Sequence, residues 1–300
     1  MFLNEILDRD VSVDFSSVDE TSNKVNFSIR KGLMEDDYES ISKDFNKKDL
    51  IKKFSYSRYD VYDRCPRRYE YAHVLNVPTR PDSSASFGST VHRTLKDFYS
   101  LLRKSKEGLD GIVSSPSLDE LLSLYEKNWV SSGYSSKRHE SIQKSKGAEI
   151  MKNYFEKVYS EKEQPFKLEE SFSAIVGDVV FTGTIDRIDT VSNSNGVHEV
   201  CIVDYKTGKD KDKSDINRDL QLPLYAFFAE EKLGLKVVGA KYIFVVSGNT
   251  IDVDVSEERR EVAKSSVLDA VERIRDGKFA PTPGFGCNYC DYRSVCKYAE

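Results

Sequence analysis

The chain has 300 residues, which is enough to bury one large hydrophobic core or two modest ones. Its 39% hydrophobic residues, with 17 Tyr and 16 Phe, exclude a disordered or collagen-like chain. The formal net charge of −5 excludes a uniformly basic, histone-like mode of nucleic-acid binding but leaves local basic strips open.

The N-terminal part of the sequence differs in composition from the rest. Residues 1–53 alternate short apolar pieces with Ser, Asn and runs of charge, which predicts an N-terminal extension that is a docking or flexible segment. Its first ten residues already carry four charges, and the sequence contains no apolar run near the ~20 residues that cross a bilayer. We therefore expect a cytoplasmic protein without a membrane partner, whose main domain occupies residues 54–300.

A strip of aromatic and basic residues opens the main domain. Between residues 56 and 71, five tyrosines are interleaved with arginines, among them Arg67 and Arg68, at helical spacing. Such residues can stack on bases and bind phosphates. The same pattern fits a half-buried helix whose tyrosines pack inward and whose arginines face water. The strip by itself leaves both interpretations open.

The remaining elements predict an α/β fold. Apolar residues first recur with a helical period and then with the two-residue period of strands, and Gly177-Asp178 is typical of a hairpin turn. The expected helices are 87–103, 118–130, 139–160, 218–233 and 256–276, and the expected strands are 168–176, 179–191, 198–205, 236–247 and 250–255. This order indicates a mixed central sheet flanked by helices.

One expected strand ends in a carboxylate and a lysine two positions apart. In the segment 202–208, the side chains of Asp204 and Lys206 point to the same face of the strand. A carboxylate and an ammonium placed together can bind a divalent cation and orient a water molecule beside it. An ordinary salt-bridged surface pair has the same spacing, so the triplet alone does not decide between the two.

Two further residues could complete such a site. Asp186 lies on the preceding strand, and antiparallel pairing would bring it beside Asp204, whereas Asp189 faces the other side and is expected to be a supporting residue. Two carboxylates near one point favour a hard cation such as Mg²⁺ or Mn²⁺. His92, near the start of a helix, is a third candidate ligand, although a helical histidine is more often a packed or solvated residue.

Four short motifs follow one another in the main domain: 88–92 (G-x-x-x-H), 183–189 (G-x-I-D-R-I-D), 204–208 (D-Y-K-T-G) and 221–225 (Q-x-x-x-Y). In this order they resemble the PD-(D/E)XK nucleases, specifically the RecB-like, AddB-like branch associated with helicases. The resemblance implies a restriction-endonuclease-like core and metal-dependent hydrolysis of DNA. It implies that His92, Asp186 and Asp204 are ligands of Mg²⁺ or Mn²⁺ and that Lys206 is the catalytic lysine. It also implies that Gln221 and Tyr225 support the site or contact DNA. The strip that contains Arg67 and Arg68 is then expected to contact DNA.

Four of the five cysteines lie near the two ends of the main domain. Cys201 sits inside an apolar strand and is expected to be a core thiol, whereas Cys65 lies 222 positions before the group Cys287, Cys290 and Cys296. Four thiolates suit either structural zinc or an iron–sulfur cluster. The split of one plus three resembles the iron–sulfur RecB-like nucleases, which implies a [4Fe-4S] cluster that joins the two ends, with zinc as the alternative.

Together these features predict a divalent-metal-dependent DNA exonuclease that acts on single strands or DNA ends in repair or recombination. The sequence has no phosphate-binding P-loop, so a motor would be a separate helicase partner. One alternative is a CRISPR-associated nuclease that trims prespacers. Another is a non-catalytic, DNA-binding iron–sulfur scaffold subunit of a helicase complex.

Overall fold

The computed structural model describes residues 51, 53–79, 82–108, 114–194 and 196–299. These residues belong to one compact unit. The predicted N-terminal extension lies outside them except for residues 51 and 53, and the side chain of Ile51 is buried in the core. The boundary expected at residue 54 therefore stays a prediction.

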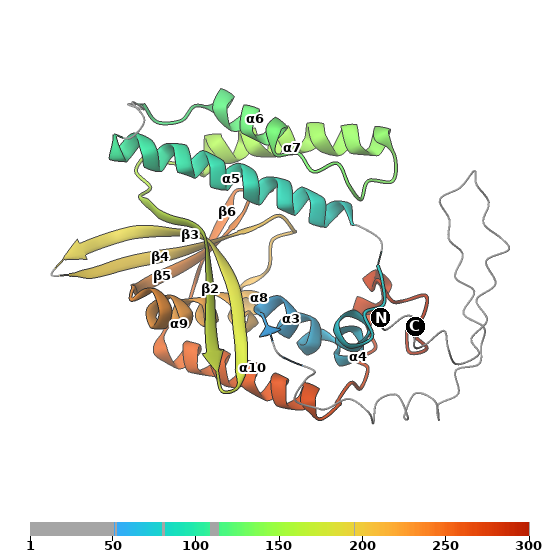
Figure 1. Ribbon diagram of the computed structural model, residues 1–300. Helices are drawn as coiled ribbons and strands as arrows, with labels where there is room; N and C mark the ends of the chain where they lie inside the picture. The colour runs from blue at the N-terminus through green and yellow to red at the C-terminus, as the bar shows by residue number, and fades with distance from the viewer. Residues whose placement is uncertain (1–50, 52, 80–81, 109–113, 195, 300) are drawn as a thin grey trace, which may run out of the picture. The chain divides into compact units, whose positions relative to one another are not determined.

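A mixed sheet of six strands forms the centre of the described part of the chain (Figure 1). The strands are β1 (Lys53–Phe54), β2 (Pro165–Val176), β3 (Val179–Ser194), β4 (Val197–Lys206), β5 (Lys236–Phe244) and β6 (Asn249–Val253). The order is β1-β3-β4-β5-β6, and β2 pairs with β3. The pairs β1/β3 and β4/β5 are parallel, and the others are antiparallel.

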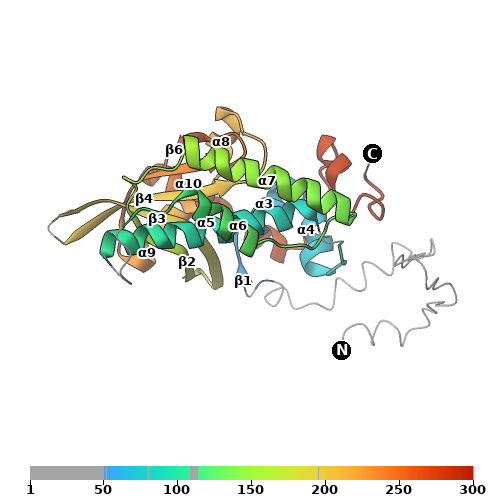
Figure 2. The same ribbon diagram turned by 90° about the horizontal axis from the view of Figure 1, so that it is seen from above.

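Helices cover both faces of this sheet. One face carries α5 (Ser83–Glu107), α6 (Leu118–Lys127) and α7 (Lys137–Lys157), which Figure 2 shows from above. On the opposite side lie α3 (Tyr56–Arg64), α9 (Gln221–Leu233) and α10 (Glu257–Arg275) (Figure 1). The shorter helices are α4 (Pro66–Tyr69), the π-helix η1 (Glu70–Val74), α8 (Lys213–Arg218) and the 3₁₀ helix η3 (Phe285–Tyr289). The expected mixed sheet flanked by helices is confirmed.

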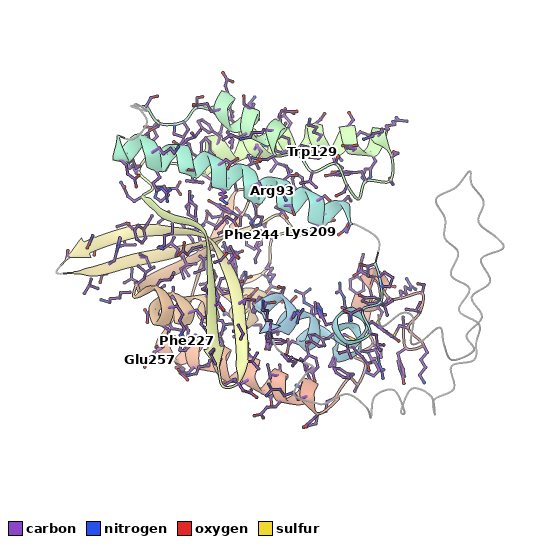
Figure 3. All side chains as sticks on the ribbon, in the orientation of Figure 1. Arg93, Trp129, Lys209, Phe227, Phe244 and Glu257 are labelled. Atoms are coloured by element: carbon purple, nitrogen blue, oxygen red, sulfur yellow. The ribbon has the colours of Figure 1, made fainter. Side chains whose placement is uncertain are left out.

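The position of the central strand β4 between two cores explains the unbroken apolar run 200–203 in its sequence. Val200 and Ile202 belong to the core on the side of α9 and α10, whereas Val203 and Tyr205 belong to the core beneath α5, α6 and α7. Because successive side chains of a strand point to opposite faces, a strand covered on both faces needs apolar residues at every position. Side chains fill the space between α5 and the sheet (Figure 3).

Local signals at the ends of elements agree with the expected hairpin, whereas several expected boundaries differ from those of the structure by a few residues. The hairpin at Gly177 is present, because Val176 pairs with Val179 and Gly177 has a φ of 64°. Helix α5 begins earlier than expected, since the side chain of Asp82 accepts a hydrogen bond from the Ser84 amide and caps the helix. The expected helix 218–233 is two helices, α8 and α9, separated by Asp219 and Leu220.

The strip between residues 56 and 71 is a half-buried helical segment. Tyr59, Tyr62 and Tyr69 are buried, as the inward-packing interpretation requires. The segment breaks at Cys65, which has an extended backbone before Pro66, because a residue that precedes proline avoids the helical conformation.

Among the helices of the described residues, none is long and apolar enough to cross a membrane.

Candidate active site

The end of β4 holds a carboxylate, an amine and an amide in mutual contact. Lys206 Nζ lies 2.8 Å from Asp204 Oδ2. Gln221, the first residue of α9, bridges the pair: its Nε2 donates to Asp204 Oδ1 at 2.7 Å, and its Oε1 accepts from Lys206 Nζ at 2.6 Å. The side chain of Asp204 is buried, whereas that of Lys206 is 25% exposed. Asp204 and Lys206 thus share one face of β4, as their spacing predicts.

Asp186 of β3 and His92 of α5 join this group from neighbouring elements. Antiparallel pairing places Arg187 opposite Val203, and the Tyr205 amide donates a hydrogen bond to Asp186 Oδ2 at 2.8 Å. His92 Nδ1 lies 3.2 Å from Asp186 Oδ1. The sheet register and the packing of α5 therefore bring together four residues that span 115 positions, from His92 to Lys206.

Glu169 of β2 also belongs to the site, and the sequence analysis missed it. On either side of Glu169, Leu168 pairs with Arg187 and Glu170 pairs with Ile185 across the two strands. Glu169 therefore stands opposite Asp186. One ligand atom each from His92, Glu169 and Asp186 lies within 4.8 Å of the other two. The predicted hairpin contained the signal, because counting seven residues back from Val176 and seven on from Val179 reaches Glu169 and Asp186.

Glu169 has an unusual backbone for its residue type. Its φ of 49° lies in the left-handed region, which non-glycine residues rarely adopt. Strain of this kind is typically found where the surrounding structure holds a residue for a functional reason. The strain therefore agrees with a role for Glu169 in the site.

The charges of the site change the proton affinities of its members. Burial alone would lower the pKa of His92, but the hydrogen bond and the charge of Asp186 raise it to about 9. Burial raises the pKa of Asp204 to about 6, although Lys206 opposes the shift. Burial and the charge of Asp186 raise the pKa of Glu169. Burial would lower the pKa of Lys206, but Asp204 outweighs it and raises that pKa.

The donor set fits a hard divalent cation. Three carboxylates and one imidazole meet beside β4, and carboxylates so close repel each other unless a proton or a cation lies between them. Oxygen and imidazole donors suit Mg²⁺ or Mn²⁺. Among the described residues, the atoms that could bind a metal come together in His92, Glu169 and Asp186, whereas both oxygens of the expected ligand Asp204 face Gln221 and Lys206.

Tyr225, the other expected supporting residue, lies one turn after Gln221 on α9 and is buried. Its ring packs edge-on against Phe172 of β2, with 5.4 Å between the ring centroids. Gly183 makes room for this contact, because a Cβ atom there would lie 2.5 Å from Phe172 Cζ and 3.2 Å from a carbon of Tyr225. Burial and the charge of Asp204 raise the pKa of Tyr225.

Behind the site, on the opposite face of β3, Asp189 binds a buried arginine, as its expected supporting position suggests. The guanidinium of Arg187 lies 3.0 Å from Asp189 and 2.8 Å from Glu163, and it donates to the Tyr205 hydroxyl at 2.9 Å. Because Tyr205 separates Asp204 from Lys206, this network holds the strand segment that carries both residues.

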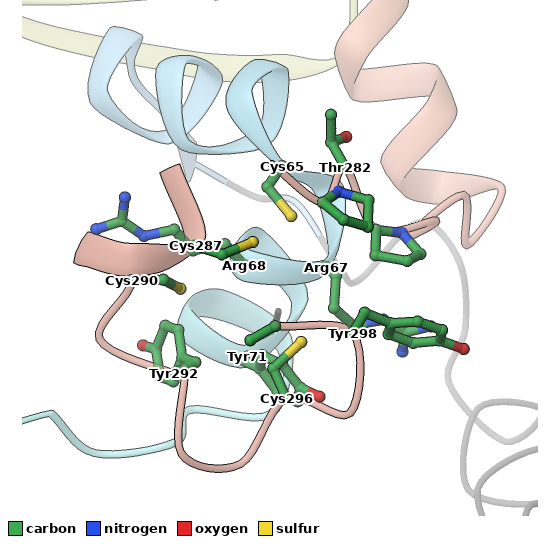
Figure 4. Close-up of a pocket in the computed structure, with 13 residues that line it drawn as sticks. Cys65, Arg67, Arg68, Tyr71, Thr282, Cys287, Cys290, Tyr292, Cys296 and Tyr298 are labelled. Carbon is green, nitrogen blue, oxygen red and sulfur yellow. The ribbon is translucent and has the colours of Figure 1, made fainter. Parts of the chain in front are cut away.

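Four cysteines from the two ends of the described chain line one cavity (Figure 4). They are Cys65, Cys287, Cys290 and Cys296, each partly buried and not disulfide-bonded, and Figure 4 shows their sulfur atoms directed toward a common space. Cys201, expected to be a core thiol, does not line this cavity and lies in β4 between the buried residues Val200 and Ile202, but it is itself only partly buried. The structure therefore brings together the four cysteines that the sequence analysis grouped.

Arg67 and Arg68, predicted to contact DNA, line the same cavity. Arg67 is paired with Glu70 at 2.6 Å, and Arg68 is paired with Asp291 at 2.9 Å. The second ion pair joins α4 to the C-terminal segment. DNA contact by these arginines stays a prediction.

Comparisons with known proteins agree with this geometry. Residues 53–297 match the family model of the PD-(D/E)XK nuclease superfamily, and the chain belongs to that superfamily. Members of this superfamily are nucleases that use divalent metals. A search of curated proteins finds no match.

Two crystal structures resemble the chain distantly. One is a Eubacterium rectale protein named as a candidate exonuclease, with 16% identity over 89% of this chain and 95% of that one and a TM-score of 0.44. The other is the protein SSO0001, with 14% identity over 83% of this chain and 87% of that one and a TM-score of 0.35. These similarities are too low to support an argument about function.

Proposed function

We propose that the chain is a divalent-metal-dependent deoxyribonuclease that hydrolyses phosphodiester bonds, acting as an exonuclease on single-stranded DNA or DNA ends in repair or recombination. This proposal rests mainly on one observation: His92, Glu169 and Asp186 lie close together beside the Asp204–Lys206 pair. Membership of a nuclease superfamily supports the reaction type. The name of the Eubacterium rectale protein agrees with exonuclease action but adds no weight of its own.

The residues divide into those that would hold the cation and those that act on the substrate. His92, Glu169, Asp186 and Asp204 would hold Mg²⁺ or Mn²⁺, which when bound neutralises phosphate charge and makes water a better nucleophile. The ammonium of Lys206 would donate a hydrogen bond to the attacking water or to a phosphate oxygen and stabilise the negative charge of the transition state. Gln221 fixes the position of that ammonium through its Oε1 atom.

We extend the proposal to the cysteine cavity, where Cys65, Cys287, Cys290 and Cys296 would hold a [4Fe-4S] cluster, with zinc as the alternative. The fit rests on four partly buried thiols around one cavity, because thiolates are the ligands of both groups. The role would be structural, since ligation would close the long loop between α3 and the C-terminal segment. A helicase partner would supply the motor that the sequence lacks.

The test is cleavage of end-labelled single- and double-stranded DNA by anaerobically purified protein, with Mg²⁺, Mn²⁺ or a chelator. We expect cleavage that requires the metal, shortens the DNA from an end and is lost in Lys206→Ala. Lys232→Ala, on the exposed side of α9, is the matched control and should cleave like the wild type. Intact DNA under every metal condition, with tight binding, would overturn the nuclease and favour a scaffold subunit.

A further inference from the structure

A buried carboxylate outside the predicted site collects four hydrogen bonds from four parts of the fold. Asp219, between α8 and α9, is 7% exposed. Its Oδ1 accepts from the Tyr56 hydroxyl at 2.8 Å, the Tyr242 hydroxyl at 2.9 Å and the Gln221 amide at 3.0 Å. Its Oδ2 accepts from Lys211 Nζ at 2.6 Å. Such a cluster fixes the carboxylate in one place, because every donor would lose a partner if it moved.

Asp219 is held as a charged group. Burial alone would raise its pKa, but the hydrogen bonds from Lys211, the Gln221 amide and Tyr56, together with the charge of Lys211, lower it below the usual value. A buried carboxylate is costly unless it is paired and hydrogen-bonded, so these partners make its burial possible. The cluster is therefore complete only when all four elements are in place.

Two of these partners reach directly into the candidate active site. Gln221, whose amide donates to Asp219, is the residue whose side chain bridges Asp204 and Lys206. Tyr242, whose hydroxyl donates to the same oxygen, turns its ring toward Lys206, with Nζ 4.7 Å from the ring centre. Asp219 thus fixes Gln221 and Tyr242, which contact the Lys206 ammonium together with Asp204.

The other two partners connect regions at a distance from the reacting groups. Lys211 lies in the segment that follows β4, so its ion pair holds the chain directly after Lys206. Tyr56 begins α3, the helix that ends at Cys65. One carboxylate therefore links the cysteine-bearing helix to the strand end that carries Asp204 and Lys206.

We propose that Asp219 is a positioning residue of the active site, which holds Gln221 and Tyr242 so that Asp204 and Lys206 keep their places, and that Tyr56 ties this arrangement to α3. The inference rests on the proposed metal-dependent nuclease. Asp219 itself makes no hydrogen bond to His92, Glu169, Asp186 or Asp204, and it acts on Asp204 and Lys206 through Gln221 and Tyr242.

The first experiment measures Mn²⁺ binding to the full chain by calorimetry, without DNA, for the wild type and Asp219→Asn. Asparagine keeps the shape but loses the charge and places an NH₂ group toward Lys211 or the hydroxyls. We expect Mn²⁺ to bind about tenfold more weakly, because partners that orient a metal site usually contribute at least that much to affinity. At saturating Mn²⁺, kcat should fall while KM for DNA stays unchanged.

Asp254→Asn is the matched control. Asp254 also accepts a backbone amide just before a helix, from Ser256 at 2.9 Å, but it is exposed at the start of α10. It should bind Mn²⁺ and cleave DNA like the wild type. Equal Mn²⁺ affinity and equal kcat in Asp219→Asn and Asp254→Asn would overturn the positioning role.

Two conservative variants decide the question if Asp219→Asn does not fold. Tyr56→Phe and Tyr242→Phe each remove one hydroxyl and leave the ring in place. Each should weaken Mn²⁺ binding about threefold, as expected for one lost hydrogen bond that acts through Asp219. Unchanged binding in both would overturn the inference.

The wild-type titration separates this inference from the proposed function. If the wild type binds Mn²⁺ but does not cleave DNA, the nuclease proposal fails and the affinities of the variants still test Asp219. If the wild type cleaves DNA and Asp219→Asn matches it, only the inference fails. A wild type that binds no Mn²⁺ would overturn both.

Discussion

The candidate active site and the cysteine cavity are built in different ways. Three of the active-site carboxylates stand on adjacent strands, and their spacing follows from sheet register and from cores on both faces. The cysteine cavity is made of short helices and a C-terminal segment without strands. From Lys278 to residue 299, Tyr292 is the one described residue that is buried.

This difference predicts different sources of stability. A segment that buries almost no apolar surface gains little from the hydrophobic effect, so side-chain links and any bound group must hold it. These links include the Arg68–Asp291 ion pair, the Tyr71–Tyr292 ring contact and the Tyr62 hydroxyl bound to the Lys278 carbonyl. The active site should therefore tolerate loss of single ligands without unfolding, whereas the C-terminal segment should not tolerate loss of its cysteines.

The largest expected effect comes from the centre of the strand-built site. Asp204→Asn keeps the shape but removes the charge that Lys206 and the cation both need, and we expect kcat to fall about 10³-fold or more with the fold intact. Asp252→Asn, on the exposed face of β6, is the control and should retain full activity. Metal-dependent cleavage assays check this, and wild-type activity in Asp204→Asn would contradict the site.

A smaller effect is expected at the ligand that the sequence did not reveal. Glu169→Gln should weaken Mn²⁺ binding about 10- to 100-fold, because a charged oxygen donor becomes a neutral one. The neighbouring Glu170→Gln should not, since Glu170 is paired with Lys167 at 2.6 Å and does not belong to the metal-binding group. Calorimetric titration compares them. Equal affinities in the two variants would remove Glu169 from the site.

The proton affinity of His92 predicts how metal binding depends on pH. Its pKa of about 9 means that, without a metal, the imidazole is protonated at neutral pH, and a protonated imidazole cannot bind a cation. Mn²⁺ affinity should therefore fall as pH falls, by about tenfold per unit well below 9. His92→Ala should bind Mn²⁺ more weakly, and its Mn²⁺ affinity should depend less steeply on pH between pH 6.5 and 8.5. The difference in slope should correspond to roughly one proton fewer released on metal binding. An equally steep dependence of Mn²⁺ affinity on pH in His92→Ala would show that another group releases the proton when the metal binds.

The cysteine region can be tested by comparing two thiols. Cys287→Ser should remove the visible absorbance of an iron–sulfur cluster and expose the C-terminal segment to proteolysis about tenfold faster, because an open segment is cut in proportion to its population. Cys201→Ser, at a partly buried position of β4 outside the cavity, should keep the absorbance and the protection. Protection that is equal in both variants would mean that the segment is held without a bound group.

The smallest expected change in activity concerns the packing of Phe172 against Tyr225 next to the site. Gly183→Ala places a Cβ atom against Phe172, and we expect a loss of about 1–3 kcal/mol in the free energy of unfolding but little change in Mn²⁺ affinity. Gly239→Ala is the control, since its Cβ would meet only Cys201 Sγ at 3.7 Å. Thermal unfolding measures both. A weaker metal site in Gly183→Ala would show that the Phe172–Tyr225 contact also positions the ligands.

Periodicity and motif spacing predicted the α/β order and the same-face placement of Asp204 and Lys206, because those properties depend on local geometry. They did not predict Glu169, which has no motif of its own and joins the site only through pairing across the hairpin. They also did not predict the break between α8 and α9, where Asp219 binds Tyr56 of α3, Tyr242 of β5 and Lys211 of the segment after β4.

The sequence by itself determined the hairpin at Gly177, the apolar run 200–203 in a strand that is buried on both faces, and the placement of Asp204 and Lys206 on one face of that strand. The tertiary structure alone decided that His92 from a helix meets Asp186 from β3, that Glu169 completes their group, and that Asp219 joins α3 to the strand end. The physical reason is how far apart in the sequence the interacting residues lie. Secondary structure follows from neighbours in the chain, whereas a site of this kind needs contacts between residues far apart in sequence, which form only when the whole sheet and its helices have packed.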